Sequence, residues 1–436
     1  MQVAILVVLV CVHTAAAHAQ GLIRDAEIEA TMSRLARPVI LAAGLSPGQV
    51  NIYMINNPRM NAFVAGGNNI FIHTGLLRRL KTQDQLQAVI AHELGHIVGG
   101  HIARRNEKLR AGRGPVAIGL LLAAAAIASG NSEAGVTAGL IGNQIAQRDF
   151  LAHSRAEESA ADQASLRYMA AAGAQPEAVL EVMRLFRGQD ALSGRYVDPY
   201  AVTHPLWGQR IRYLQDRVAS APKGKPPSAQ DAYWHSRMVA KFDGFIGNTR
   251  RTIQKYKDDK TEIGTLARAV AYHRVPNLKA ARRNVDALIK ARPNDPYYHE
   301  LKGQFLLEGG DAKGAVSSYR TAARLAPNEA LILSGLGRAL VALDTGAATQ
   351  EALDVLVRAR SMDDKDPSVL RNLATAYARV GQTGRASLAT AERFALQGRL
   401  RDAQVHARRA TRQLSEGSPG WRQAQDILRL TTRLQN

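Results

Sequence analysis

The sequence predicts a mainly α-helical chain in two parts: an N-terminal α+β domain with a small β-sheet, and a C-terminal helical solenoid. Three observations support this prediction. Aromatic residues make up only 5% of the chain while alanine and leucine are abundant, which favours helices. Alternating apolar segments are confined to residues 50–73, and small residues recur at repeat spacing beyond residue 280. With 436 residues, the chain has room for two domains.

The first 19 residues have the pattern of a secretory signal peptide. A short apolar run over residues 3–12 is followed by an A-x-A cleavage pattern before Gln20. Cys11 is the only cysteine and falls inside this leader, so the mature chain would carry no thiol. We therefore expect a protein of the bacterial periplasm, since stray thiols are oxidised there.

The net charge of +20 favours acidic partners, which include anionic lipid headgroups, lipopolysaccharide and acidic proteins. Nucleic acid is not expected, because the chain lacks a basic groove-reading helix and an aromatic stacking motif. Residues 115–146 are apolar but short for a membrane span. They predict two helices that cap a site or rest on a membrane surface, and a transmembrane hairpin is the minority alternative. Peripheral contact with the outer membrane is thus part of the expectation.

The elements expected before residue 80 are a helix, three strands and a short helix, over residues 25–43, 50–55, 61–65, 70–73 and 75–80. The glycine- and asparagine-rich stretch 66–69 predicts a hairpin turn between the second and third strands. A strand edge at Asn61, Ala62 and Phe63 would hold an extended peptide by backbone pairing. The alternative is a purely structural hairpin.

The central motif is His92-Glu93-x-x-His96. Thr82 and Gln85 predict the start of its helix, which we expect to continue to about Arg104. Residues four apart share a helix face, so His92 and His96 can bind one Zn²⁺. Glu93 can then serve as general base on the attacking water. His101 is expected on another side of this helix, as a packing or surface histidine.

A second predicted helix begins near Ser154 and offers the missing ligand. Glu158 and Asp162 lie one turn apart on it and face the same way. A carboxylate here would complete a His₂Glu zinc site, and Asp162 could accept a hydrogen bond from a ligating histidine. Glu157 is the competing ligand, although it has no acidic partner four residues on.

Several motifs in order resemble the gluzincin metallopeptidases related to HtpX and to the CAAX prenyl protease. The resemblance covers about residues 25–217 and rests on Asn61-Ala62-Phe63, Gly66-Gly67, His92-Glu93-x-x-His96, Ser154-Arg155-x-x-Glu158-x-x-Ala161-Asp162, and His204-Pro205-Leu206 with Arg210. It implies a zincin-like metalloprotease fold. A signal peptide together with C-terminal repeats resembles the periplasmic branch of this family.

The resemblance implies a role for each matching residue. His92, His96 and Glu158 would be the ligands of one zinc ion per chain, and Glu93 the general base. His204 would occupy the fourth metal position until a substrate displaces it, accompanied by Arg210. The implied substrates are exported or misassembled outer-membrane proteins. The rival hypothesis is a non-proteolytic or latent chaperone or scaffold for outer-membrane protein assembly.

The C-terminal half predicts tetratricopeptide repeats. Gly303, Ala315, Tyr319 and Pro327 fall at repeat spacing, and similar sets follow to residue 410. Stacked repeats form a concave groove, so we expect this half to bind substrates and the outer-membrane assembly machinery. The predicted domains are a signal peptide (1–19), a metalloprotease domain (20–219), a linker (220–230) and a repeat domain (231–436).

Overall fold

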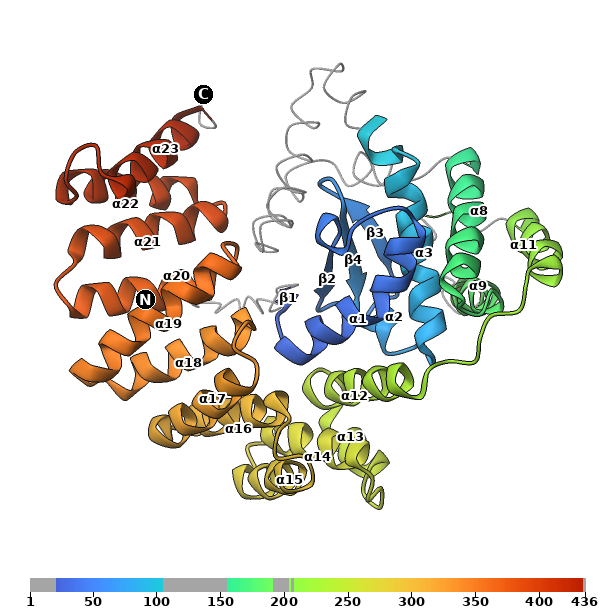
Figure 1. Ribbon diagram of the computed structural model, residues 1–436, viewed down its shortest axis with the longest axis horizontal. Coiled ribbons are helices and arrows are strands. Elements are labelled where there is room, and N and C mark those ends of the chain that lie inside the picture. Colours follow the sequence, from blue (N-terminus) through green and yellow to red (C-terminus); the bar gives the residue numbers. More distant parts are fainter. Residues whose placement is uncertain (1–20, 105–154, 191–203, 205–207, 434–436) are drawn as a thin grey trace, which may run out of the picture.

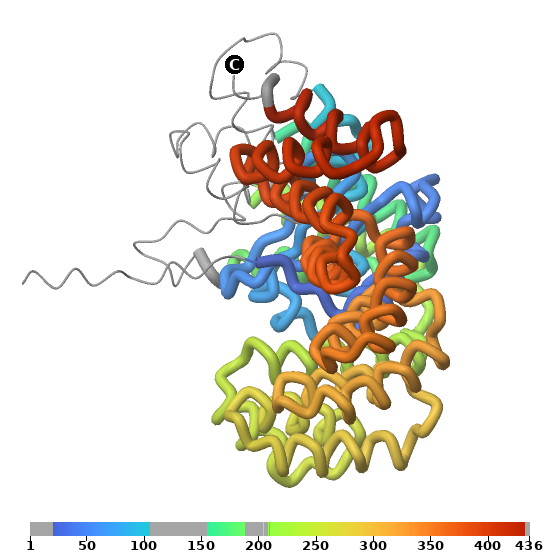
Figure 2. The backbone as a smooth tube through the Cα atoms, turned by 90° about the vertical axis from the view of Figure 1, so that its left-hand side faces the viewer, coloured from blue at the N-terminus to red at the C-terminus, as the bar shows by residue number. Residues whose placement is uncertain are grey.

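The computed structural model describes residues 21–104, 155–190, 204 and 208–433. A sheet with its covering helices forms one half, and a curved array of paired helices forms the other (Figure 1). Seen from the side, the array climbs past the N-terminal half from the yellow to the red helices (Figure 2). The predicted fold class is confirmed. The expected signal peptide (1–19) and the apolar stretch 115–146 lie outside the described residues.

The sheet has four strands in the order β1-β2-β4-β3. Their bounds are β1 (Leu22–Ile23), β2 (Asn51–Ile55), β3 (Ala62–Ala65) and β4 (Asn69–His73). As expected, β3 and β4 form an antiparallel hairpin, whereas β2 pairs with β4 in parallel. One face carries an aromatic row in which Phe71 stacks on Tyr53 and Phe63, with ring centroids 5.3 Å apart in each pair. The other face supplies apolar side chains to the main core. β3 is therefore an edge strand.

The helices of this half are α1 (Ala26–Ala42), α2 (Thr74–Leu77), α3 (Gln83–Val98), α8 (Arg155–Ala172), α9 (Glu177–Asp190) and α11 (Gly208–Ser220). Side-chain caps fix the starts of two of them: Asp25 accepts from Ile28 N–H, and Thr82 accepts from Gln85 N–H. Both α1 and α8 pack against α3. The central helix α3 is thus buried along nearly its whole length.

The helix α3 ends at Val98 and does not continue to Arg104 as predicted. Gly99 caps it, and Gly100 adopts φ +65°, which turns the chain away from the helix axis. Only glycine takes such a backbone angle without strain. The turn changes the direction in which His101 points, and this matters for the site described below.

The C-terminal half consists of packed helices with the bounds α12 (Ala229–Phe245), α13 (Thr249–Lys255), α14 (Glu262–Arg274), α15 (Leu278–Ala291), α16 (Pro296–Glu308), α17 (Ala312–Leu325), α18 (Ala330–Leu343), α19 (Gly346–Met362), α20 (Pro367–Arg379), α21 (Thr383–Leu396), α22 (Leu400–Gln413) and α23 (Pro419–Arg433). Consecutive helices pack against each other. Tyr319 is buried between Gly303 and Gly335, where any Cβ would collide with its ring. This explains why small and aromatic residues recur at repeat spacing.

The helix α12 joins the two halves. Met238 and Phe242 belong to the core around α3, whereas Ala240 belongs to the first repeat core. Buried charges add to this junction: the guanidinium of Arg237 contacts Glu27 and Asp295 and is fully buried. The halves therefore share one helix and one buried ionic network.

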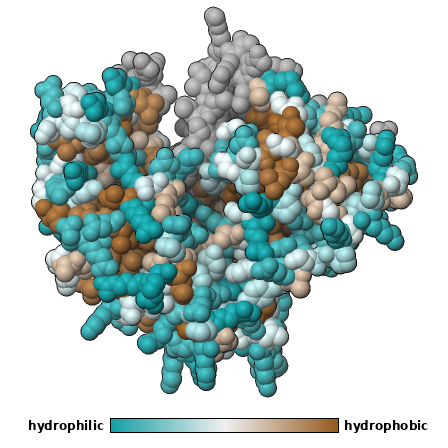
Figure 3. Space-filling model, in the orientation of Figure 1, coloured by the Kyte–Doolittle hydropathy of each residue, from teal (hydrophilic) through white to brown (hydrophobic). Residues whose placement is uncertain are grey.

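Among the described residues, no helix combines the length and the apolar character needed to cross a bilayer. The face drawn in Figure 3 is mostly hydrophilic, with hydrophobic residues gathered in separate patches on both halves. The segment for which a membrane contact was expected is not among these residues, so that expectation stays a prediction.

Candidate metal centre

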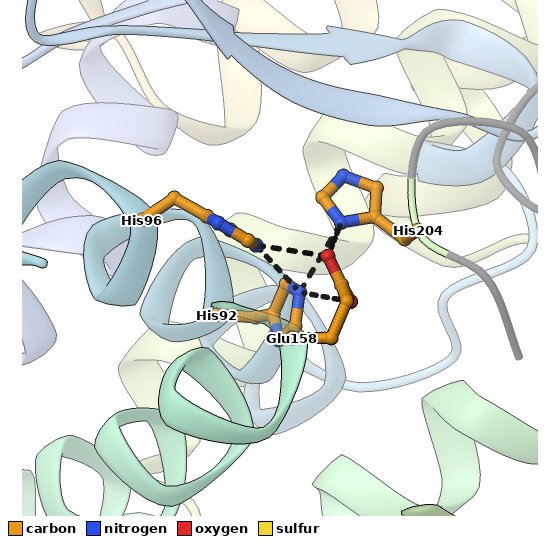
Figure 4. Close-up of side chains that lie close together, drawn as sticks. All are labelled: His92, His96, Glu158 and His204. Carbon is orange, nitrogen blue, oxygen red and sulfur yellow. Dashed lines mark hydrogen bonds and ion pairs between the residues drawn. The ribbon is translucent and has the colours of Figure 1, made fainter. Parts of the chain in front are cut away.

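The site lies where α3 crosses α8. A Cβ on Gly95 would sit 2.8 Å from the Cα of Ala161, so the two backbones meet where both residues are small. This close approach places Glu158, in the first turn of α8, beside His92 and His96 on α3. His204 comes from a separate segment and points into the same cluster (Figure 4).

Four side chains converge on a common point (Figure 4). His92 Nε2 lies 3.2 Å from His96 Nε2, 3.4 Å from His204 Nδ1 and 3.5 Å from Glu158 Oε2. His96 Nε2 lies 3.4 Å from Glu158 Oε1. A tetrahedral zinc site with bonds of about 2.0–2.1 Å has ligand atoms about 3.3–3.4 Å apart. His204 Nδ1 lies 2.9 Å from Glu158 Oε1. These distances range from 2.9 to 3.5 Å, close to the spacing of a tetrahedral metal site.

The charges of the cluster also fit a divalent cation. Glu93, Glu158 and Asp162 are buried, and Arg210 is the buried guanidinium beside them. Burial opposes ionisation of Glu158, but attraction to His204 and hydrogen bonds from the histidines hold its pKa well below the usual value. Burial lowers the pKa of His96 far below 6.5, which leaves the neutral imidazole that ligates metals. Buried carboxylates outnumber the single buried guanidinium, an environment that suits a divalent cation.

Asp162 and Arg210 hold the ligands in place. Asp162 Oδ1 lies 3.2 Å from His92 Nδ1, the nitrogen that faces away from the cluster. Burial would lower the pKa of His92, but its hydrogen bonds with Asp162 and Glu158 raise it to about 10. Arg210 donates to Asp162 through Nε at 2.7 Å and contacts Glu158 Oε2 at 2.7 Å. Arg210 thus links the two carboxylates of α8.

His101 was missed as a site residue by the sequence reasoning. The turn at Gly99–Gly100 brings its ring back to α3, where His101 Nδ1 lies 2.9 Å from His96 Nδ1. His101 is 4% exposed. The contact leaves His96 Nε2 directed at the other ligands. The glycine pair after the motif was the available signal, since it predicts the end of a helix.

Glu93 is fully buried beside the cluster. Among the described residues, neither of its carboxylate oxygens has a hydrogen-bond partner, and Oε1 lies 3.5 Å from His204 Nε2. Burial raises the pKa of this carboxyl above its ordinary value, against the attraction of His204 and His92. An acid so placed is suited to accept and return a proton.

The predicted substrate-binding residues lie on the edge strand next to His204. Ala62 O accepts a hydrogen bond from His204 Nε2 at 3.2 Å, while Asn61 O accepts from the backbone of β4. Asn61 and Ala62 are buried, and Phe63 is half-buried on the sheet face away from α3. His204 therefore contacts both the metal-ligand cluster and the strand edge.

Comparison with known proteins agrees with this geometry. Residues 22–218 match peptidase family M48, and residues 251–407 match a tetratricopeptide-repeat family. Residues 22–218 belong to peptidase family M48. The resemblance drawn from the sequence motifs is thus confirmed, and the M48 domain of this chain is followed by protein-interaction repeats.

Named relatives match this chain over most of its length or over part of it. The chain is 26% identical over 406 residues to the beta-barrel assembly-enhancing protease of Escherichia coli (strain K12), which covers 91% of this chain and 81% of that protein. The protein of the same name from Yersinia pestis is 25% identical over 365 residues, and the match covers 81% of this chain and 73% of that protein. The mitochondrial metalloendopeptidase OMA1 of Schizosaccharomyces pombe is 31% identical over 191 residues, covering 44% of this chain and 53% of that protein. The M48 domain is accordingly a metallopeptidase domain.

Proposed function

We propose that this protein is a zinc-dependent endopeptidase of the periplasm. The observation that carries the proposal is the set of four buried donor atoms with tetrahedral zinc spacing, with Glu93 beside them. His92, His96 and Glu158 would hold the zinc ion, and Glu93 would be the general base. A zinc ion bound there supplies Lewis acidity toward the peptide carbonyl and the attacking water.

The protein's own residues supply the remaining chemistry. Glu93 takes a proton from the attacking water and returns it to the leaving amine, a transfer for which its raised pKa suits it. Asp162 fixes the ring of His92, and Arg210 fixes Asp162. Backbone groups of β3 at Ala62 would pair with an extended substrate.

In this proposal, the arrangement around His204 is a closed state of the enzyme. A catalytic zinc site keeps one position open for water or substrate, whereas a structural site is closed. Here His204 lies at the fourth position, and its Nε2 donates a hydrogen bond to the carbonyl of Ala62. We infer that His204 must leave before a peptide can enter.

The proposed substrates are exported or misassembled outer-membrane proteins. This part of the proposal rests on the name of the beta-barrel assembly-enhancing proteases and on the expected signal peptide. The tetratricopeptide repeats would dock the substrate or the outer-membrane assembly machinery. Contact with the outer membrane at its periphery belongs to the same proposal.

Cleavage of an unfolded β-barrel protein by purified variants tests the peptidase. We expect Glu93→Gln to lower the cleavage rate at least about 100-fold, since the general base is lost. His204→Ala should cleave faster than the unmodified protein, because the fourth position is open. Zinc content, measured by mass spectrometry with His92→Ala as the metal-free control, should stay near one per chain in Glu93→Gln.

The closed site also favours a second candidate, a scaffold whose zinc is structural. The same variants distinguish the two. If unmodified protein, Glu93→Gln and His204→Ala cleave at equal rates, or none cleaves, the peptidase proposal is wrong and the scaffold remains.

A further inference from the structure

A groove near the C-terminal end of the repeats has no role in the proposed chemistry. It is an open hollow of about 640 Å³ between α20, α21 and α22, a volume typical of ligand sites. Its floor is made of small side chains, among them Ala374, Ala378 and Ala386. These leave the hollow open, while Thr375 and Thr390 add hydroxyl groups.

The groove is lined by positive charge. Arg371, Arg379, Arg393 and Arg409 surround it together with His406, and the described lining contains no carboxylate. Over residues 367–436 the sequence has twelve arginines and four acidic residues. Four of these twelve arginines line the groove.

In the part of the chain that the structure describes, three of the four groove arginines, Arg371, Arg393 and Arg409, have no ion pair with an acidic side chain. Burial lowers the pKa of Arg393, and repulsion from Arg371 and Arg399 lowers it further. Among the described residues, Arg393 Nε is buried without a hydrogen-bond partner. Arg379 is the exception, because it contacts Asp344 at 3.1 Å. An anion entering the groove would therefore find donors ready to receive it.

We propose that this groove binds an extended acidic segment of a partner polypeptide. Arginine pairs with carboxylates through two parallel hydrogen bonds, and the concave face of stacked repeats accepts extended chains. Arg371 and Arg379 lie two turns apart on α20, about 12 Å. That is close to the separation of about 13 Å between residues i and i+4 of an extended chain, which point to one side. This match in spacing favours a polypeptide over a lipid surface.

Binding to the full-length protein tests this inference without reference to peptidase activity. The probe is a fluorescent twelve-residue peptide of alternating Glu and Ser, and its control replaces every Glu by Gln. The groove variant is Arg371→Gln/Arg409→Gln, because both side chains are exposed and their loss should not unfold the repeats. The matched control is Arg282→Gln/Arg283→Gln, which removes the same charge from exposed positions on α15.

We expect the acidic peptide to bind the unmodified protein, and the groove variant to bind it at least about tenfold more weakly. The α15 control should differ by less than about twofold, and the Gln peptide should not bind. Equal loss in both variants, or equal binding of both peptides, would overturn the proposal. Phosphatidylglycerol vesicles form the third arm. If the groove variant loses vesicle binding while peptide binding is absent or unchanged, the ligand is a lipid headgroup and the proposal is wrong.

Discussion

His101 shows how one residue can set the geometry of its neighbour. Its Nδ1 contacts His96 Nδ1 at 2.9 Å and is shielded from solvent. A hydrogen bond at the far nitrogen of a metal-binding histidine fixes the ring and its tautomer. His101 thus contacts the far nitrogen of His96 in the same way that Asp162 contacts the far nitrogen of His92.

We predict that His101→Phe lowers zinc affinity about 10–100-fold, the usual loss when such a partner is removed. His101→Asn keeps a polar side chain and should lose less. A competitive titration against a chromophoric chelator measures both. Equal affinity in the phenylalanine variant would show that the contact only fills space.

His73 makes the stability of the M48 domain depend on pH. Burial lowers its pKa to about 4, whereas the unfolded chain titrates near 6.5. The unfolded state therefore binds more protons between these values, and stability falls as the pH drops through this window. At pH 5 the protonation of His73 in the unfolded state lowers the free energy of unfolding by about 2 kcal/mol.

Urea unfolding at pH 7.5 and pH 5 tests this prediction. His235, whose pKa burial also lowers to about 4, adds to the effect in the unmodified protein. The His73→Phe variant should consequently lose about 2 kcal/mol less between the two pH values. If His73→Phe and the unmodified protein lose the same free energy of unfolding between the two pH values, groups other than His73 cause the pH dependence.

Among elements, the crossing of α3 and α8 determines whether the ligands meet. The Cβ of an alanine at position 95 would collide with the backbone of Ala161, so α8 must move away. We predict that Gly95→Ala weakens zinc binding at least about tenfold, because a small displacement of Glu158 breaks the ligand geometry. Gly48→Ala is the matched control, since its Cβ would meet nothing within 4 Å. Zinc content and circular dichroism of both variants are the measurements. A Gly95→Ala protein with full zinc content would contradict the argument.

Hydrophobic periodicity predicted which residues share a helix face. It missed features that depend on turns or on contacts between residues far apart in the sequence. Helical spacing placed His92 and His96 on one face, and likewise Glu158 and Asp162. The early end of α3 was missed because the apolar pattern runs past Gly99–Gly100. The strand β1 was missed since two residues cannot show alternation. His204 could be proposed only from the family resemblance, because no spacing connects it to α3.

At the scale of the whole molecule, a buried ionic network fixes the two halves against each other. Arg237 on α12 contacts Glu27 on α1, a pair 210 residues apart that no sequence pattern indicated. Removing one member of a buried pair leaves the other charge without compensation, which costs about 3–5 kcal/mol. An exposed bridge between the same helices, Arg34 with Asp231, contributes only about 0–1 kcal/mol.

Chemical denaturation of two variants tests this contrast. Arg237→Met should lower the free energy of unfolding by about 3–5 kcal/mol, and Arg34→Ala by less than about 1 kcal/mol. Adding Glu27→Gln to Arg237→Met should restore part of the loss, since the stranded carboxylate is then gone. Similar losses in the two single variants would mean that burial of the network is unimportant.

The shared helix α12 has a practical consequence for anyone who divides this chain. A fragment that stops before Ala229 would keep all the metal ligands, yet it would lack Met238 and Phe242 from its interior. Such a fragment would expose the apolar surface that α12 covers, and it should aggregate on expression. Conversely, a protease cut at the 221–228 connection would nick the backbone while both pieces stay associated.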